Sequence, residues 1–363
     1  MQKQKVLSQA SHLTTLNRAK GDKKMKKFLK SDLNALLNSI NERIYLPVSV
    51  SGQTNYGIYD ENSKVDLETL KTVKSAKEVF FPQSETLFTA FIDGKKIRIA
   101  QEELEKEDFV LFGVKACDVK GIEVLDKVFL SDPVDSFYKA RRDHGIIVSL
   151  ACGEPEESCF CKAFGIDCAA PCGDVVLYDC GEYYYWDAKT EKGEALTAEC
   201  AALTDADEAP VKEKQEEIRK IVSLLPYMNI SLDSWKGATT DEKFGSAVWE
   251  ELYKPCLACG TCTFVCPTCQ CYDIKDYNTK NGVQRYRCWD SCMYSDFTMM
   301  AHGNNRTSQL QRFRQRFMHK LVYFPANNDG MFSCVGCGRC VDKCPASTNI
   351  IKVIKAFEKE GDK

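Results

Sequence analysis

The chain has little histidine, no strong excess of charge and no long apolar run. Only four of its 363 residues are His, so few side chains suit general acid–base chemistry near neutral pH. Lys and Arg total 49 against 52 Asp and Glu, a formal net charge of −3, and this balance does not favour nucleic acid as a partner. No apolar segment approaches the roughly 18 to 20 residues that span a bilayer, so we expect no membrane insertion.

Nucleotide-binding motifs are missing as well. No G-x-G-x-x-G follows an expected strand and no P-loop occurs, so the chain offers no recognisable nicotinamide site of its own. Residues 1–24 are polar and lack the apolar core of a secretory signal, which favours a cytoplasmic protein. We interpret residues 1–24 as a flexible N-terminal extension, with the fold beginning at Met25.

Cysteine is what the chain has in excess. Twenty Cys are several times ordinary usage, in a chain too long and too rich in apolar residues to be a small disulfide-stapled scaffold. In a reducing compartment, many cysteines favour metal binding over disulfides. At about 150 residues per domain, the length suggests two domains.

The N-terminal domain, residues 25–235, has the pattern of an α/β fold. Short β-branched runs alternate with helical ones, and strands are expected at residues 79–81, 109–114 and 145–150. The last two are almost wholly apolar, which is typical of strands buried on both faces. Asp118 is expected to cap the helix that follows the second of these strands.

The C-terminal domain, residues 236–363, is expected to be mainly helical. A helix is predicted over residues 307–324, with apolar residues on one face and Arg312, Arg316 and Lys320 in a stripe on another. This basic stripe either offsets a nearby negative charge, docks an acidic partner, or is an ordinary solvated face.

Two runs of cysteine in this domain repeat one spacing. They are Cys256-x2-Cys259-x2-Cys262-x3-Cys266-Pro267 and Cys334-x2-Cys337-x2-Cys340-x3-Cys344-Pro345. This is the run of bacterial dicluster ferredoxins, in which the fourth cysteine of each run binds the other cluster. The spacing therefore predicts a bacterial-type dicluster ferredoxin domain with two [4Fe–4S] clusters. The expected ligands are a first cysteine set (Cys256, Cys259, Cys262 and Cys344) and a second cysteine set (Cys334, Cys337, Cys340 and Cys266).

Zinc is the alternative for these eight thiols, because four cysteines also suit a tetrahedral zinc ion. The chain would then be a zinc-stabilised interaction module. Zinc sites are built from paired Cys-x2-Cys units, however, and have no need for a triple run closed by Cys-Pro, present here twice.

A third cysteine set lies in the α/β domain and consists of Cys117, Cys152, Cys159 and Cys161. Cys117 and Cys152 each follow an expected strand, and the carboxyl ends of parallel neighbouring strands are where open α/β sheets bind ligands. We expect a third [4Fe–4S] cluster there, with buried structural thiols as the alternative. No role is predicted for the remaining scattered cysteines, which are Cys168, Cys172, Cys180, Cys200 and Cys288.

Four more cysteines lie between the two ferredoxin runs: Cys288, named above, and three that we call the interval cysteines, which are Cys269, Cys271 and Cys292. Two of them follow Cys266-Pro267 directly, so they must lie beside a cluster. They are candidates for additional metal ligands, or for thiols that pack and donate hydrogen bonds near a cluster.

These residues together resemble a known family. Residues 111–118 (LFGVKACD), the Arg141–Arg142 pair, the Cys159–Cys161 turn, and residues 256–271 with 289–292 (WDSC) resemble the iron–sulfur β subunit of cytoplasmic sulfhydrogenases. They are also similar to the corresponding iron–sulfur chain of anaerobic sulfite reductase and to the iron–sulfur partner in flavin oxidoreductase complexes that feed heterodisulfide reductases. The resemblance covers nearly all of residues 25–355.

The resemblance implies an electron-transfer subunit of a soluble anaerobic oxidoreductase complex rather than a catalytic chain. A partner subunit that holds FAD and NAD(P) would exchange electrons with this chain, which would relay them to or from a terminal hydrogenase, sulfite reductase or heterodisulfide reductase subunit. The alternative from another class is a catalytic subunit, in which a cluster near the interval cysteines reduces a sulfur compound directly.

Overall fold

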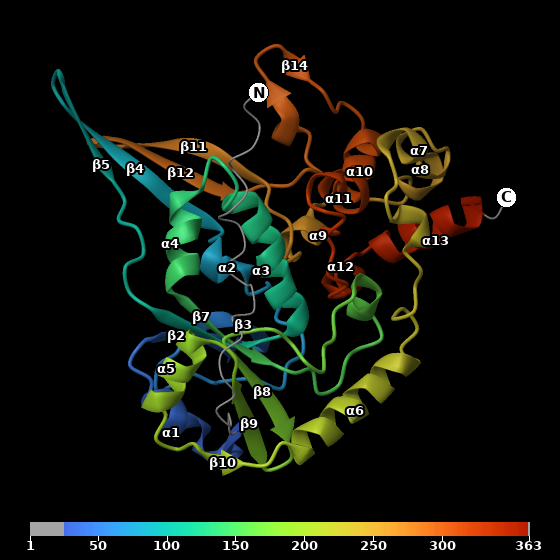
Figure 1. The fold of residues 1–363 in the computed structure, drawn as a ribbon. Helices are drawn as coiled ribbons and strands as arrows, with labels where there is room; N and C mark the ends of the chain where they lie inside the picture. Colours follow the sequence, from blue (N-terminus) through green and yellow to red (C-terminus); the bar gives the residue numbers. More distant parts are fainter. Residues whose placement is uncertain (1–24, 362–363) are drawn as a thin grey trace, which may run out of the picture.

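The computed structural model describes residues 25–361, so the prediction for residues 1–24 lies outside the described part. Its largest element is an eight-stranded sheet in the order β10-β1-β9-β8-β7-β6-β2-β3 (Figure 1). Strands β2, β6, β7 and β8 are parallel to their neighbours in that series, and the outer pairs are antiparallel. The strands are β1 (Met25–Leu29), β2 (Arg43–Val50), β3 (Gln53–Ile58), β6 (Phe109–Val114), β7 (Gly145–Leu150), β8 (Val175–Cys180), β9 (Tyr183–Ala188) and β10 (Thr204–Ala206).

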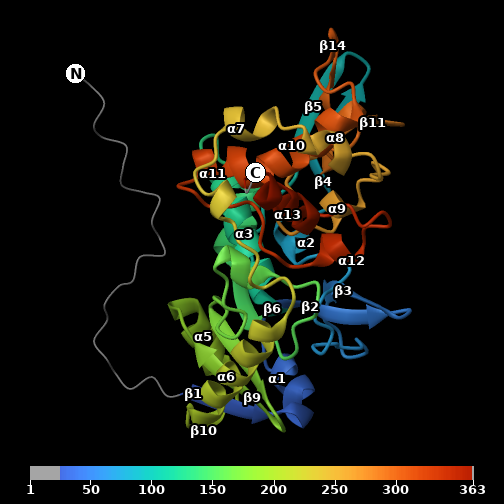
Figure 2. The same cartoon turned by 90° about the vertical axis from the view of Figure 1, so that its right-hand side faces the viewer.

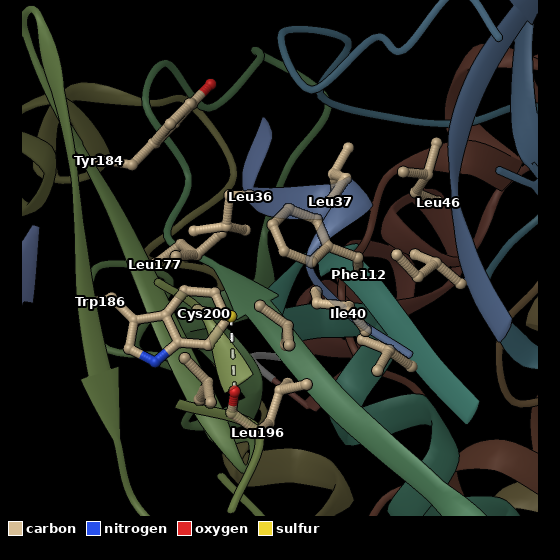
Figure 3. Packing of buried hydrophobic residues seen from close by; sticks show 14 of the residues in the cluster. Leu36, Leu37, Ile40, Leu46, Phe112, Leu177, Tyr184, Trp186, Leu196 and Cys200 are labelled. Carbon is tan, nitrogen blue, oxygen red and sulfur yellow. Dashed lines mark hydrogen bonds between the residues drawn. The ribbon is translucent and has the colours of Figure 1, made fainter. Parts of the chain in front are cut away.

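Strands β6 and β7 occupy the residues predicted for them, and every residue of both is buried. They are apolar throughout because hydrophobic cores cover both faces of the sheet. One core contains Phe112 and Trp186, whose ring centroids are 6.4 Å apart (Figure 3). The other contains Leu111 and buried residues from three helices. The helices of this half are α1 (Leu33–Asn38), α2 (Lys77–Phe80), α3 (Ala116–Phe129), α4 (Ser136–His144), α5 (Glu191–Glu199) and α6 (Ala209–Leu224).

Two local predictions for this half were wrong. Residues 79–81 do not form a strand, because Val79 and Phe80 lie in helix α2, where Phe80 packs into the core beside Phe109. Asp118 does not cap helix α3, whose N-cap is Lys115. The Asp118 carboxylate lies in the first helical turn and is used instead in a buried ion pair described below.

A second, four-stranded antiparallel sheet joins the two halves of the chain. Its order is β11-β12-β4-β5, with β4 (Ser84–Asp93) and β5 (Lys96–Gln101) from the N-terminal half and β11 (Tyr272–Thr279) and β12 (Gly282–Trp289) from the C-terminal half. Strand β12 pairs with β4 from Gly282 opposite Phe91 to Cys288 opposite Ser84. The prediction of a helical C-terminal domain did not include this hairpin.

The remaining C-terminal elements are mostly short helices around a core of their own. Helix α10 (Gln309–Met318) begins at a capping box of Ser308 and Gln311, and it continues through a π-helical turn over 319–323, so the predicted helix is present. Trp249, Phe313 and Phe317 are buried in this core. The other elements are α7 (Thr240–Phe244), α8 (Val248–Leu252), α9 (Thr261–Phe264), α11 (Phe324–Asn327), α12 (Arg339–Asp342), α13 (Ile350–Gly361), β13 (Met299–Met300) and β14 (Gly303–Asn304).

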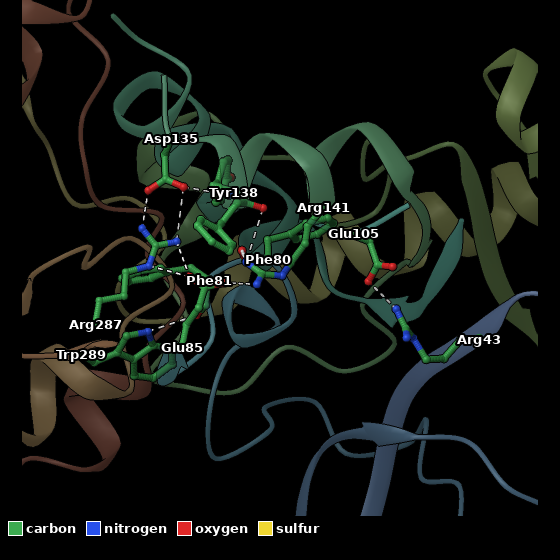
Figure 4. A network of polar contacts seen from close by, with 11 residues as sticks. Arg43, Phe80, Phe81, Glu85, Glu105, Asp135, Tyr138, Arg141, Arg287 and Trp289 are labelled. Carbon is green, nitrogen blue, oxygen red and sulfur yellow. Dashed lines mark hydrogen bonds and ion pairs between the residues drawn. The ribbon is translucent and has the colours of Figure 1, made fainter. Parts of the chain in front are cut away.

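Buried ion pairs hold the hairpin β11–β12 to the α/β half (Figure 4). Arg287 on β12 binds Glu85 of β4 and Asp135, which is the N-cap of α4. Arg141 of α4 binds the same Glu85 carboxylate. Figure 2 shows the larger sheet in the lower half of the molecule and the C-terminal helices in the upper half. Among residues 25–361, no helix is long and apolar enough to cross a membrane.

Candidate metal centres

The first cysteine set lines one cavity at the start of helix α9. Cys256, Cys259 and Cys262 come from the loop and first turn of that helix, and Cys344 reaches the cavity from the second ferredoxin run. Backbone N–H groups already point at two of the sulfurs: Ala258 N lies 3.4 Å from Cys256 Sγ, and Thr348 N lies 3.2 Å from Cys344 Sγ. N–H groups placed in this way stabilise thiolate ligands of iron–sulfur clusters.

Tight backbone turns shape this loop. Gly260 has φ +74°, and a Cβ there would meet the Tyr294 hydroxyl at 2.6 Å. Only glycine adopts this conformation without strain and leaves room for the Tyr294 ring. The Tyr294 hydroxyl donates to the carbonyl of Cys259, whose thiol is the most exposed of the set.

The second cysteine set is enclosed more deeply. The thiol of Cys266 lies close enough to those of Cys334, Cys337 and Cys340 to raise the pKa of each. The last cysteine of the first run therefore lies near the first three of the second run. Burial raises the pKa of the Cys337 thiol to about 12. Thiols buried in this way become ligands when metal binding displaces their protons.

The loop of the second set packs closely on the third set. Gly336 has φ +60°, and a Cβ there would lie 2.4 Å from the carbonyl oxygen of Phe160. The N–H of Phe160 in turn donates to the carbonyl of Gly336 over 2.9 Å. The Cys159–Cys161 turn and the ferredoxin loop therefore touch backbone to backbone.

Three buried cations face these thiols, and no Asp or Glu among the described residues forms an ion pair with them. They are Lys77, Arg316 and Lys320, with exposed fractions of 2%, 3% and 4%. Lys320 Nζ lies 3.4 Å from Cys266 Sγ and also donates to Thr268 and Ser333. Arg316 faces Cys262, Cys340 and Cys269, and its Nε has no hydrogen-bond partner.

Buried charges that lack a partner are costly, so these three cations indicate an anionic group at the thiols. A cubane bound by four thiolates carries net negative charge and fits this requirement. Of the basic stripe predicted on helix α10, Arg316 and Lys320 therefore offset local negative charge. Arg312 instead donates to the backbone carbonyls of Met293 and Arg306.

The third cysteine set is brought together at the carboxyl ends of β6 and β7, which are parallel neighbours, the condition on which this set was expected. Cys152, Cys159 and Cys161 belong to one packed core, and Cys117 packs against it. Lys115 is also buried there and faces the thiols of Cys152 and Cys117, which counteract the lowering of its pKa by burial.

Cys168 joins the third set, although no role was predicted for it. The Cys152 thiol donates to Cys168, and the Cys168 thiol donates to Cys161, which raises the pKa of Cys168 to about 12. The N–H of Cys152 also donates to the carbonyl of Cys168 over 3.0 Å. No periodic signal in the sequence predicts this contact, because Cys168 lies in an irregular loop.

Two contacts link the third set to the second. The thiol of Cys117 lies close enough to Cys337 to feel its charge, while burial raises the pKa of Cys117 well above its ordinary value. Beside them, Arg339 forms a bidentate ion pair with Asp118, at 2.6 and 2.7 Å, and donates to the carbonyl of Thr72. The three cysteine sets are thus neighbours in the order first, second, third.

The interval cysteines lie beside the second set. The Cys269 thiol donates to Cys266, and together with Lys320 and Lys77 it lowers the pKa of Cys266 well below its ordinary range. The Cys292 thiol donates to Cys271 and lowers the pKa of Cys271 to about 7 against the effect of burial. Lys77 donates to the carbonyl of Cys269 over 2.9 Å and lies over the Trp289 ring at 3.9 Å.

The other cysteines lie apart from these groups. Cys172 is exposed, and Cys288 lies half-buried on β12 opposite Asp273. Cys180 and Cys200 donate to backbone carbonyls of Pro210 and Leu196. Sequence reasoning also missed Lys77 and Lys115, because an isolated lysine carries no sign of burial in the sequence.

The fold and these thiols define an iron–sulfur electron-transfer protein. Residues 255–348 match the family model described as a 4Fe-4S dicluster domain. The chain is also 33% identical over 322 residues to "Sulfhydrogenase 2 subunit beta" of Pyrococcus furiosus, a match that covers 86% of this chain and 91% of that protein. The chain therefore belongs to the family of iron–sulfur β subunits of sulfhydrogenases. No solved structure matches it.

Proposed function

We propose that this chain relays single electrons between a flavin subunit that reacts with NAD(P)(H) and a terminal catalytic subunit of hydrogenase, sulfite reductase or heterodisulfide reductase type. The single observation that carries the proposal is the adjacency of the three cysteine sets within one fold. When bound, a [4Fe–4S] cluster takes up and gives back one electron. The chain's residues hold such groups in order and control their charge environment.

The proposed route starts at the surface beside Cys259. This thiol is exposed, and Leu257 near it is 67% exposed, whereas the cysteines of the second set are buried or half-buried. From the first set the route passes to the second at Cys262 and Cys266, which feel each other's charge. It continues from Cys337 to Cys117 in the third set.

The third set is proposed to hold a cluster on Cys117, Cys152, Cys159 and Cys161. The buried cation Lys115 supports an anionic occupant here, just as Arg316 and Lys320 do in the ferredoxin domain. Cys168 is placed to donate a hydrogen bond to a ligand sulfur, which tunes a cluster's potential. We also propose residues 25–235 and 236–363 as its two domains, and the cytoplasm as its location.

Iron and acid-labile sulfide, measured per chain on anaerobically purified protein, test the proposal together with EPR of the dithionite-reduced sample. About four iron per cluster are expected, so loss of the third set in Cys117→Ala should remove about four iron and one reversible signal. Cys200→Ala is the matched control, because Cys200 is a buried thiol in a different hydrophobic core from the three cysteine sets.

Two results would contradict parts of the proposal. If Cys117→Ala retains all of the wild-type iron, the third set holds structural thiols only. If the wild-type protein contains zinc in place of iron, or its signals do not respond reversibly to reduction, the chain does not relay electrons.

A further inference from the structure

We propose that the interval cysteines Cys269, Cys271 and Cys292 bind an additional iron–sulfur cluster through three thiolates, leaving one iron without a protein thiol. The inference rests on the proposed function, because the new site lies against the second cysteine set and would extend the same relay. It concerns thiols outside both ferredoxin runs and outside the α/β domain.

The backbone brings the three thiols together from two segments. Cys269 and Cys271 follow the turn after Cys266, and Cys292 follows strand β12. The N–H of Asp290 donates to the carbonyl of Cys271 over 2.9 Å, which closes the base of the β11–β12 hairpin. The N–H of Cys292 points at the Cys271 sulfur, and the thiols of Cys269 and Cys292 feel each other's charge.

The surroundings are built for negative charge. Lys77 is 2% exposed and forms no ion pair within residues 25–361, and the ionisable groups that face it are the thiols of Cys269, Cys266 and Cys271 and the ammonium group of Lys320. The unpartnered Nε of Arg316 lies on a side chain that also faces Cys269. Because Lys77 faces Cys269 and Cys271 as well as Cys266, thiolates on a metal–sulfur cluster at the interval cysteines would balance its charge directly, whereas neutral thiols or a disulfide there would not.

The neighbouring chemistry favours an iron–sulfur cluster over a single zinc ion. The Cys269 thiol donates to Cys266, an expected ligand of the second set, and all three interval cysteines lie within residues 255–348, which match a 4Fe-4S dicluster domain. A structural zinc site takes four protein ligands, whereas a cubane can be held by three thiolates.

Cys292→Ala is the decisive variant, because Cys292 is the interval cysteine most remote in sequence from the ferredoxin runs. We expect it to lose about four iron per chain while the EPR signals of the first and second sets persist. Cys288→Ala is the matched control, since Cys288 is a half-buried thiol on the same hairpin that faces Lys275. This control should keep all of the iron.

A second measurement uses the wild-type protein and does not depend on the stability of a variant. A cluster with three thiolates releases its unprotected iron first, so mild anaerobic oxidation with ferricyanide should produce a [3Fe–4S] EPR signal that Cys292→Ala lacks. Iodoacetamide applied to the folded holoprotein should leave Cys269, Cys271 and Cys292 unmodified.

Several results would overturn this inference without touching the electron-transfer proposal. Unchanged iron in Cys292→Ala would do so, as would loss of zinc instead of iron. A disulfide between Cys271 and Cys292 in peptides from the holoprotein would also exclude it. The absence of any reversible EPR signal from the wild-type protein would instead refute the proposed function itself.

Discussion

The buried ion pair between Arg339 and Asp118 gives the sharpest stability prediction. It joins helix α12 of the dicluster domain to helix α3 of the α/β domain, and the two side chains are only 3% and 1% exposed. Although burial alone would lower it, the pKa of Arg339 is raised well above its ordinary value by Asp118 and Cys337. Asp118→Asn removes the carboxylate and leaves the buried guanidinium without its ion-pair partner.

The expected cost follows from the burial of the pair. Removing one partner of a buried ion pair destabilises a protein by about 3 to 5 kcal/mol. An unfolding entropy of roughly 2.1 cal/mol/K per residue over about 340 residues gives about 0.7 kcal/mol/K, so Tm should fall by about 4 to 7 °C. The double variant Asp118→Leu with Arg339→Met should regain most of this loss, because it leaves no charge unpaired.

Differential scanning calorimetry of the anaerobic holoprotein measures these shifts. The matched control is Asp276→Asn, which breaks the bidentate pair between Asp276 and Arg285, whose side chains are each 45% exposed. An exposed pair contributes at most about 1 kcal/mol, so this control should move Tm by less than about 1.5 °C. Equal shifts in the two variants would refute the reasoning from burial.

Three further predictions concern charge, pH and packing. Lys320→Met should make the reduction potential of the cluster at the second set more negative, because it removes a cation 3.4 Å from Cys266 Sγ. An EPR redox titration measures this potential, and an unchanged value would contradict the prediction. Burial, with Lys320 and Arg306, lowers the pKa of His319 to about 4. As pH falls from about 6.5, the unfolded state therefore binds a proton before the folded state does, and the free energy of unfolding should drop by up to about 3 kcal/mol between pH 6.5 and 4. In thermal scans, His319→Gln should lose less stability over that range. Phe317→Ala, fully buried in the C-terminal core, should cost about 3 to 5 kcal/mol in the same scans, whereas Leu224→Ala, 79% exposed, should cost less than about 1 kcal/mol.

The strongest sequence signals predicted the parts of the fold that local chemistry determines. Strands β6 and β7 were predicted at their observed bounds because burial on both faces requires continuous apolar runs. The grouping of Cys266 with the second ferredoxin run followed from a spacing that few other sites require. The convergence of Cys117 and Cys152 followed from the geometry of parallel strands.

Long-range contacts explain what the sequence could not show. Residues 79–81 are apolar and strand-like in composition, yet helix α2 ends within them because Phe80 and Phe81 pack against distant aromatic rings. Asp118 is a residue type that often caps helices and it lies near the start of helix α3. Its carboxylate instead forms an ion pair with Arg339, which lies more than 200 residues later in the chain. Lys77 and Arg316 resemble surface residues in sequence, and only the fold reveals that they are buried beside thiols.

The four-stranded sheet takes two strands from each half of the chain, and this has a consequence for synthesis of the protein. Strand β4 can pair with β5 as soon as both leave the ribosome, but its other edge must wait for β12, roughly 190 residues later. At about 5 to 20 residues per second, that edge stays open for roughly 10 to 40 s. An unpaired ten-residue edge is a template for aggregation, so the nascent chain passes through a vulnerable interval that ends only when the segment between the two ferredoxin runs has been made.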